Sequence, residues 1–263
     1  MRLQQNNSAL LELRRLTKYF GGLPALEAVS FTIARGQITA LIGPNGAGKT
    51  TLINCLSGVV PPDGGTIIFA GRDITGLPAH RLARLGLTRT FQNLRLFPRL
   101  TVLENVLCGL TSQTSESFWQ ALWRPPRLRH LERKLRLMAL DALDTYGLPG
   151  KGDLPAWVLP YGDKKKVELA RALVSQPVLT LLDEPVAGLN SAETAQIAAI
   201  IEQLRRAGKT ILLVEHDLDL VMSVADKVVV LDSGRVIATG TPAEVQHNPL
   251  VLEAYLGFLS PTA

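Results

Sequence analysis

Cysteine is scarce in this sequence of 263 residues, which contains only Cys55 and Cys108. Two isolated cysteines provide neither a disulfide framework nor a thiolate cluster for a metal, so we expect a reducing compartment. No uninterrupted apolar run reaches the ~20 residues that a membrane-spanning helix requires. Residues 1–8 also lack the apolar run of a signal peptide. We therefore expect a soluble or peripheral protein, and any membrane-spanning part is expected in another chain.

Charge is also limited, at 19% of residues with a net charge of +5 and a pI of about 9.4. This mild basicity suits ATP, an anionic membrane surface or nucleic acid, and does not distinguish among them. Apolar residues make up 46% of the sequence, which is enough for a large core. The length allows one domain or two.

Residues 43–50, GPNGAGKT, fit G-x-x-x-x-G-K-[ST], the pattern of a phosphate-binding loop. Residues 37–42 before it read as a buried strand, and residues 51–57 after it as the first turns of a helix. In this context backbone N–H groups and the helix N-terminus bind phosphate. The alternative interpretation is an ordinary glycine turn with a surface lysine, which would not bind phosphate. Lys49 is expected to reach the β- and γ-phosphates, and the Thr50 hydroxyl to hold Mg²⁺. The candidate nucleotide-binding residues are Gly43, Pro44, Asn45, Gly46, Ala47, Gly48, Lys49, Thr50 and Thr51.

Polar side chains follow three further predicted strands. Asp183 and Glu184 end the apolar run 178–182, at the edge where α/β sheets bind ligands. We expect Asp183 to hold Mg²⁺ and Glu184 to polarise the water that attacks the γ-phosphate. His216 also follows a buried strand, and its position suggests a γ-phosphate contact. Gln92, at another strand end, is a candidate Mg²⁺ ligand or γ-phosphate sensor.

A last signal spans residues 159–163, LPYGD, followed by three lysines at 164–166. A glycine turn that opens a helix makes a second anion-binding site. The spacing alone does not indicate whose phosphate binds there.

The remaining pattern is an alternation of short apolar strands and helices, which implies a mainly parallel sheet covered by helices. The predicted strands are residues 10–16, 26–33, 37–42, 66–69, 87–91, 178–182, 211–214, 227–231 and 236–238. The predicted helices are residues 51–57, 78–85, 101–110, 127–146, 163–175, 191–207 and 218–225, with a helical tail from 242. Residues 93–158 break the alternation and read as helical.

Together these signals resemble, over nearly the whole chain and in the same order, the nucleotide-binding subunit of ATP-binding-cassette transporters. The resemblance implies ATP and Mg²⁺ as cofactors. It places Gln92 in the Q-loop, residues 187–190 in the D-loop and His216 at the switch histidine. It also implies that Phe20, or its neighbour Tyr19, stacks on adenine.

Within that superfamily, residues 89–97, residues 187–190 and the ending at 248–257 resemble the branched-chain amino-acid importer group. Importers of urea, short amides or other carboxylates are expected to look much alike. The implied fold is α/β, a P-loop ATPase core with a mainly parallel sheet, an antiparallel β subdomain at the N-terminal side and an inserted helical subdomain. We expect one ATPase domain over residues 1–263, with the helical subdomain at about 93–175.

The resemblance also implies a dimeric mechanism, in which ATP on one subunit's phosphate loop is closed over by the signature of a second ATPase subunit, identical or homologous. The expected partners are that subunit, transmembrane permease subunits and, indirectly, a solute-binding protein, with no nucleic acid. The expected location is the cytoplasmic face of the inner or plasma membrane, as a peripheral protein. Leu94, Leu96, Phe97 and Leu100 either dock a cytoplasmic helix of the permease or pack within the helical subdomain.

The signature departs from the family's usual Leu-Ser-Gly-Gly-Gln. Pro160 replaces the serine, Tyr161 the first glycine and Asp163 the glutamine, while Gly162 remains. Pro160 has neither a hydroxyl nor an N–H to offer a phosphate, and Asp163 places a carboxylate where an anion should dock. Asp163 is instead a candidate cap for the following helix. In a heteromeric pair, the partner's signature would then serve this chain's ATP.

Three other functions are compatible with parts of this sequence. A cassette ATPase of DNA repair or chromosome maintenance usually has long heptads or zinc cysteines between Gln92 and the signature, and this sequence has neither. A relative on the lipopolysaccharide export route would have different Q-loop residues. A non-enzymatic regulatory subunit fits Pro160 and Asp163 but not the intact Lys49 and Glu184.

Overall fold

The computed structural model describes residues 9–90, 95–113 and 126–256. Backbone contacts divide the chain into two compact units. The first unit contains Met1–Leu82, Leu181–Glu184 and Ile201–Ala263, and the second contains Ala83–Thr180 and Pro185–Ile200. The second unit thus starts earlier than the predicted helical subdomain and includes a segment beyond it.

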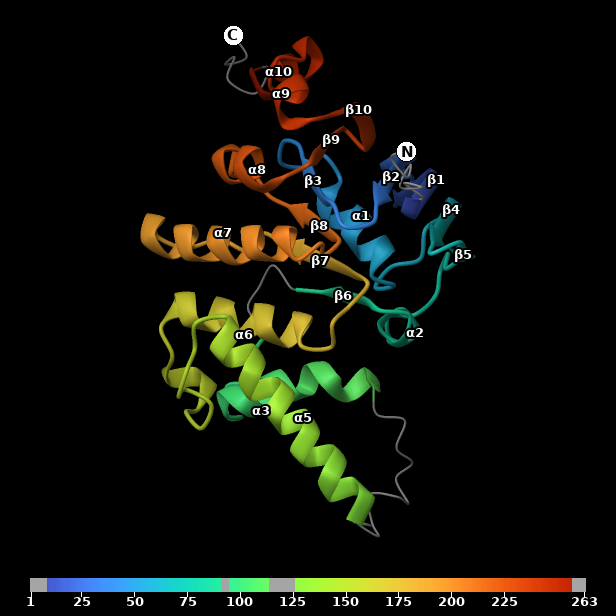
Figure 1. The fold of residues 1–263 in the computed structure, drawn as a ribbon. Coiled ribbons are helices and arrows are strands. Elements are labelled where there is room, and N and C mark those ends of the chain that lie inside the picture. The colour runs from blue at the N-terminus through green and yellow to red at the C-terminus, as the bar shows by residue number, and fades with distance from the viewer. Residues whose placement is uncertain (1–8, 91–94, 114–125, 257–263) are drawn as a thin grey trace, which may run out of the picture. The chain divides into compact units, whose positions relative to one another are not determined.

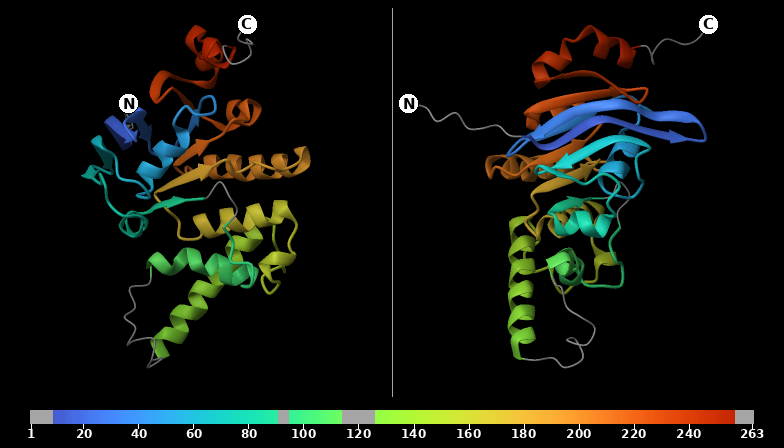
Figure 2. Two further views of the ribbon diagram at one scale, coloured as in Figure 1. Left: turned by 180° about the vertical axis from the view of Figure 1, so that it is seen from behind. Right: turned by 90° about the vertical axis from the view of Figure 1, so that its right-hand side faces the viewer.

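The first unit begins with an antiparallel sheet in the strand order β2-β1-β4-β5 (Figure 1). Its strands are β1 (Ala9–Phe20), β2 (Leu23–Ala34), β4 (Gly64–Phe69) and β5 (Arg72–Asp73). The long hairpin of β1 and β2 is drawn in blue in Figure 2. Both strands are longer than the sequence pattern predicts, because pairing continues to the turn at Gly21 and Gly22.

A second, mostly parallel sheet carries the predicted site. Its strands are β3 (Ile38–Ile42), β7 (Leu179–Asp183), β8 (Ile211–Val214), β9 (Lys227–Asp232) and β10 (Arg235–Gly240). All lie in the first unit, except that β7 belongs to it only from Leu181 onward. They follow the order β10-β9-β3-β8-β7. β3 is parallel to β8 and β9, and β10 forms an antiparallel hairpin with β9.

The burial of these strands explains the residue patterns seen in their sequences. Every residue of β3, β7 and β8 is buried, which is why these strands read as continuous apolar runs rather than as alternating patterns. In β2 the predicted alternation is confirmed, since Val29, Phe31 and Ile33 are buried.

Helices α1 (Lys49–Leu56), α8 (Leu218–Val224), α9 (Pro242–Gln246) and α10 (Pro249–Leu256) belong to the first unit. The last three share an apolar cluster with β3 and β9. Its buried members are Ala40, Ile42, Val221, Ala225, Val228, Val230, Val245 and Val251. The C-terminal helices therefore pack onto the strand that leads into the phosphate-binding motif.

The second unit is mainly helical (Figure 1). Its elements are β6 (Leu87–Arg89), α3 (Val102–Leu107), the 3-10 helix η1 (Cys108–Gln113), α5 (Pro126–Thr145), the 3-10 helix η2 (Ala156–Val158), α6 (Tyr161–Leu173) and the first part of α7 (Ser191–Arg206). The short helix α2 (Ala79–Arg84) begins in the first unit and ends in the second. A capping box between Thr101 and Glu104 starts α3.

The predicted fold class is confirmed: an antiparallel N-terminal sheet, a mostly parallel main sheet and a helical subdomain. Most predicted element positions hold to within a few residues, although β1 ends at Phe20 rather than at 16 and the short strand β5 is not predicted. β6 ends at Arg89, before the predicted end at 91, and α6 begins at Tyr161 rather than 163. Within the described residues, no helix is both long and apolar enough to cross a membrane. A single ATPase domain over residues 1–263 stays a prediction.

The buried thiol of Cys55, on α1, gives a test of this packing. Burial raises its pKa to about 11, and only the thiolate is alkylated readily. In a Cys108→Ser variant at about pH 8, we expect iodoacetamide to modify Cys55 at least about a hundredfold more slowly in the folded than in the urea-unfolded protein. Mass spectrometry measures both rates. Equal rates would mean that the packing around α1 does not bury this thiol.

Candidate functional site

Three strands of the first unit end at the same edge of the main sheet. Leu41 of β3 lies opposite Val214 of β8, and the Glu184 N–H donates to the Val214 carbonyl at 2.9 Å. The segments after β3, β7 and β8 therefore leave the sheet side by side. This brings together the phosphate-binding motif, Asp183 and Glu184, and His216, all of which were predicted at strand ends.

The loop leaves β3 through a narrow gap at Gly43. A Cβ on Gly43 would lie 2.0 Å from the Leu231 carbonyl oxygen, so no larger residue fits without a backbone shift. Further along, the Gly234 N–H in the β9–β10 turn donates to the Ala47 carbonyl at 3.0 Å. The loop is thus held at its start by the end of β9 and near its middle by the following turn.

Lys49 is folded back over this loop. Its Nζ donates to the carbonyls of Gly43 at 2.6 Å and Pro44 at 2.9 Å. Burial lowers the pKa of Lys49, and the nearby Glu184 and Asp183 carboxylates offset part of that shift. Lys49 is the first residue of α1, and an ammonium at a helix N-terminus attracts anions. The phosphate contact of Lys49 stays a prediction.

The two carboxylates at the end of β7 differ in setting. Asp183 is buried, and Glu184 is half-buried. Glu184 has a φ of 48°, a left-handed conformation that is strained for a residue with a side chain. Such strain is often retained at functional sites, and here it turns the chain immediately after the carboxylate pair.

The oxygen groups at this edge are compatible with Mg²⁺. Thr50 is exposed and Thr51 half-buried in the first turn of α1, and the Asp183 carboxylate belongs to the same unit. A hydroxyl and a carboxylate are hard oxygen donors that suit Mg²⁺, which is commonly bound through one or two carboxylates plus substrate phosphates. Consistent with this, the described residues contain no group of three or more His, Cys, Asp or Glu side chains that would form a protein-only metal site.

His216 is exposed beyond β8. Its Nδ1 lies 3.9 Å from Oε2 of Glu215, whose side chain is fully buried. The next residue, Asp217, caps α8 by accepting the Leu220 N–H at 3.0 Å. The His216 imidazole is therefore exposed to solvent, while the residues on either side of it are held by the burial of Glu215 and by the cap that Asp217 forms on α8.

The predicted adenine-stacking residues lie at the end of the β1–β2 hairpin. Tyr19 and Phe20 are about half exposed, at 46% and 51%. The Lys18 ammonium lies 5.5 Å from the centre of the Phe20 ring and pairs with Asp63 at 3.0 Å. Both rings remain accessible for stacking. Gln92 and Leu94 lie outside the described residues.

The signature segment belongs to the second unit, where it contacts the D-loop of the same chain. The Tyr161 hydroxyl donates to the Ala187 carbonyl at 3.4 Å, and its ring would be 3.3 Å from a Cβ on Gly188. Gly162 packs so closely on α7 that a Cβ there would be 2.6 Å from Oε1 of Glu193. The tyrosine and glycine of this signature thus connect α6 to the D-loop and the start of α7.

The expectation that Asp163 caps α6 is wrong. Pro160 is the N-cap residue and makes no side-chain cap, whereas Asp163 lies in the first helical turn. The Asp163 carboxylate pairs with Lys151 at 2.5 Å and Lys166 at 3.5 Å. Lys151 was missed, because a pair twelve positions apart across a loop leaves no local sequence signal. Two lysines offset one carboxylate, so this helix start is not a negatively charged surface.

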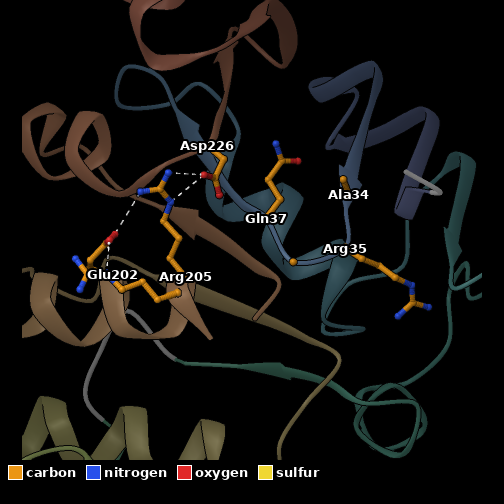
Figure 3. A pocket seen from close by; sticks show the side chains of 8 residues that line it. Ala34, Arg35, Gln37, Glu202, Arg205 and Asp226 are labelled. Carbon is orange, nitrogen blue, oxygen red and sulfur yellow. Dashed lines mark hydrogen bonds and ion pairs between the residues drawn. The ribbon is translucent and has the colours of Figure 1, made fainter. Parts of the chain in front are cut away.

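A pocket of about 480 Å³ lies at the opposite end of β3 from the phosphate-binding motif. Figure 3 shows the Arg205 guanidinium between Asp226 and Glu202. Asp226 also accepts the Ile38 N–H at 2.9 Å. These charges hold α7 to the start of β3, and we assign them a structural role.

The family model for "ABC transporter" matches residues 26–187, and that for "Branched-chain amino acid ATP-binding cassette transporter" matches residues 235–257. BraF of Pseudomonas aeruginosa, a high-affinity branched-chain amino acid transport ATP-binding protein, is 43% identical over 249 residues, 94% of this chain and 98% of BraF. LivG of Escherichia coli, described in the same words, is 42% identical with the same coverage.

Solved structures show the same similarity. An ATP-binding cassette of an ABC transporter in its ADP conformation aligns with a TM-score of 0.82 at 34% identity, covering 95% of this chain and 99% of that chain. A dimeric ATP-binding cassette in a post-hydrolysis state, bound to ADP and Pi, aligns with a TM-score of 0.75 at 25% identity, covering 88% and 98%.

The gap at Gly43 leads to a second prediction. Gly43→Ala forces the loop away from Leu231, so we expect at least about a tenfold loss of ADP affinity, the scale of a lost charge-assisted contact. Isothermal titration calorimetry measures it. Gly64→Ala, whose Cβ would meet only Thr17 at 3.7 Å, is the control and should change the affinity less than about twofold. Equal affinities for both variants would contradict the proposed loop geometry.

Proposed function

This chain belongs to the ABC transporter family of ATP-binding proteins, and we propose that it hydrolyses ATP for a membrane importer of branched-chain amino acids. The observation that carries the proposal is the meeting of the phosphate-binding loop, the Asp183–Glu184 pair and His216 at one edge of the main sheet. The similarity to BraF and LivG along almost their entire length supports the solute class.

In this proposal, the backbone N–H groups of residues 43–51 bind the phosphates, and Lys49 leaves the loop carbonyls to pair with the β- and γ-phosphates. An aromatic ring at Phe20 or Tyr19 stacks on the adenine. The ammonium needs only a side-chain rotation, because the loop itself is already held from Leu231 and Gly234. A preformed loop lowers the conformational cost of binding.

Hydrolysis requires a base beside the γ-phosphate. Glu184 is assigned this role, since its carboxylate follows β7 at the loop edge and its backbone is fixed by the bond to Val214. His216 is assigned to hold the attacking geometry, and Lys49 to stabilise the developing charge. Thr50 and Asp183, with Gln92 from sequence, are the residues that would hold Mg²⁺, which when bound neutralises phosphate charge.

We further propose that the active form is a dimer in which Pro160, Tyr161, Gly162 and Asp163 face ATP on a second ATPase subunit. The paired state of Asp163 supports this role, because Lys151 and Lys166 offset its charge. The second subunit is either identical or homologous. A similar cassette bound to ADP and Pi is dimeric, which supports a dimer for this chain.

The surface that meets the permease is proposed to include Phe97, whose side chain is 52% exposed. The buried Asn105 fixes its backbone by accepting the Phe97 N–H at 2.8 Å and donating to its carbonyl at 3.0 Å. Leu96 and Leu100 are half-buried, which suits packing within the unit better than docking. The proposed location is the cytoplasmic face of the membrane, beside the permease, with a solute-binding protein as an indirect partner.

The catalytic assignment is tested by Glu184→Gln. Loss of a general base lowers kcat by about 10²–10⁴-fold, while nucleotide affinity should stay within about threefold. The measurement is phosphate release by the chain assembled with its membrane subunits, with leucine uptake followed in parallel. Glu132→Gln, an exposed change on α5, is the control. Equal turnover of Glu184→Gln and wild type would remove Glu184 from this role, and uptake of urea but not leucine would refute the solute assignment.

The docking assignment is tested by Phe97→Glu. A charge at the centre of an apolar contact costs several kcal/mol unless it is paired, so we expect loss of co-purification with the permease and normal ADP binding by the isolated chain. Leu137→Glu, at a position on α5 that is 58% exposed, is the matched control and should leave assembly intact. Assembly and transport by Phe97→Glu at wild-type levels would show that Phe97 does not dock the permease.

A further inference from the structure

The C-terminal helix α10 packs against the strand that leads into the phosphate-binding loop. Its Tyr255 ring lies against the apolar cluster that contains Ala40 and Ile42 of β3. Ile42 is the residue immediately before Gly43. Figures 1 and 2 show α9 and α10 in red, beside β10 in the same unit. A residue near the end of the chain is thus close to the first residue of the loop.

The Tyr255 hydroxyl is the unexplained group in this contact. Its oxygen is buried, and within the described part of the chain it has no hydrogen-bond partner of normal geometry. A buried polar atom without a partner is costly, and each such atom in a folded protein calls for an explanation. Burial raises the pKa of the Tyr255 phenol, and the backbone N–H of Gly43, which lies beside the phenol oxygen, partly offsets that rise.

We propose that Tyr255 is a positioning residue for nucleotide binding: its hydroxyl accepts the Gly43 N–H and fixes where the phosphate-binding loop begins. A small movement of either group completes this hydrogen bond. The proposal rests on the proposed function of the loop. Tyr255 itself does not touch the nucleotide.

The contact would complete the anchoring of Gly43. Its Cα is held against the Leu231 carbonyl, and its own carbonyl accepts from Lys49 at 2.6 Å. The N–H is the remaining backbone group, and Tyr255 is the acceptor beside it. When Lys49 turns to a phosphate, the carbonyl anchor is lost, so the bond to Tyr255 keeps the start of the loop in place.

Tyr255 lies within residues 235–257, the segment matched by the branched-chain amino acid cassette model. The general ABC transporter model ends at residue 187. Support of the loop by α10 would therefore give this C-terminal segment a role in nucleotide binding. If Tyr255 did not support the loop, the cluster around Val245 and Val251 would contribute only to the stability of the fold.

The Gly43 amide can be observed directly by NMR. Ile42–Gly43 is the only isoleucine–glycine pair in the sequence. The full chain labelled with carbonyl-¹³C isoleucine and ¹⁵N-glycine therefore gives one correlation peak, from Gly43. The peak position and its hydrogen exchange are compared in wild type, Tyr255→Phe and Tyr146→Phe. Tyr146 is a matched control, since its phenol is also buried but lies in the second unit.

In Tyr255→Phe we expect the Gly43 proton to move upfield and to exchange about tenfold faster, as for loss of one hydrogen bond. We also expect the ADP Kd and the KM for MgATP to rise about three- to tenfold with kcat within about twofold. Tyr146→Phe should change none of these quantities. A rise in Kd and KM with a nearly constant kcat is the result expected of a positioning residue. A merely structural residue would lower the melting temperature without changing these constants.

An unmoved Gly43 peak with unchanged exchange in Tyr255→Phe would overturn the proposal. So would a higher melting temperature without any change at Gly43, since the hydroxyl would then be only an unpaired buried group. If wild type binds no ADP, the proposed function fails instead, and the Gly43 peak still decides whether Tyr255 holds the loop.

Discussion

The contact between Gly43 and the Leu231 carbonyl is the constraint on which the site depends. It allows β3 to run unbroken to the edge of the sheet and then turn at once into the loop, with no room for a side chain at the turn. Because β8 and β7 end at the same level, the residues that follow them meet the loop without any long connection. A shift of β3 along β9 by one residue would reverse its side-chain faces and separate these groups.

Much of this arrangement was predictable from sequence because its signals are local. The loop pattern, the apolar runs of β3, β7 and β8, and the carboxylates directly after β7 lie within short windows. The features that were missed depend on distant residues. Nothing near Asp163 indicates Lys151, and nothing near Tyr161 indicates Ala187. The left-handed backbone of Glu184 occurs where its N–H bonds the Val214 carbonyl of β8, far away in the sequence. The capping role expected for Asp163 failed because Pro160 already starts the helix.

The unusual signature is better explained by the structure than by the sequence. Tyr161 and Gly162 fill roles that join α6 to the D-loop and α7 of the same chain. Asp163 is charge-compensated rather than free. Replacement of the serine and the first glycine therefore does not imply loss of activity. In this chain, part of the segment's interactions go to the D-loop.

We propose that nucleotide binds at the edge formed by β3, β7 and β8. The most direct measurement is the affinity for MgATP of wild type and Lys49→Ala by isothermal titration calorimetry, with Lys134→Ala on the exposed face of α5 as the control. We expect a loss of at least about tenfold for Lys49→Ala, because a charge-assisted phosphate contact is removed, and no change for the control. An unchanged affinity in Lys49→Ala would mean that nucleotide binds elsewhere on the protein.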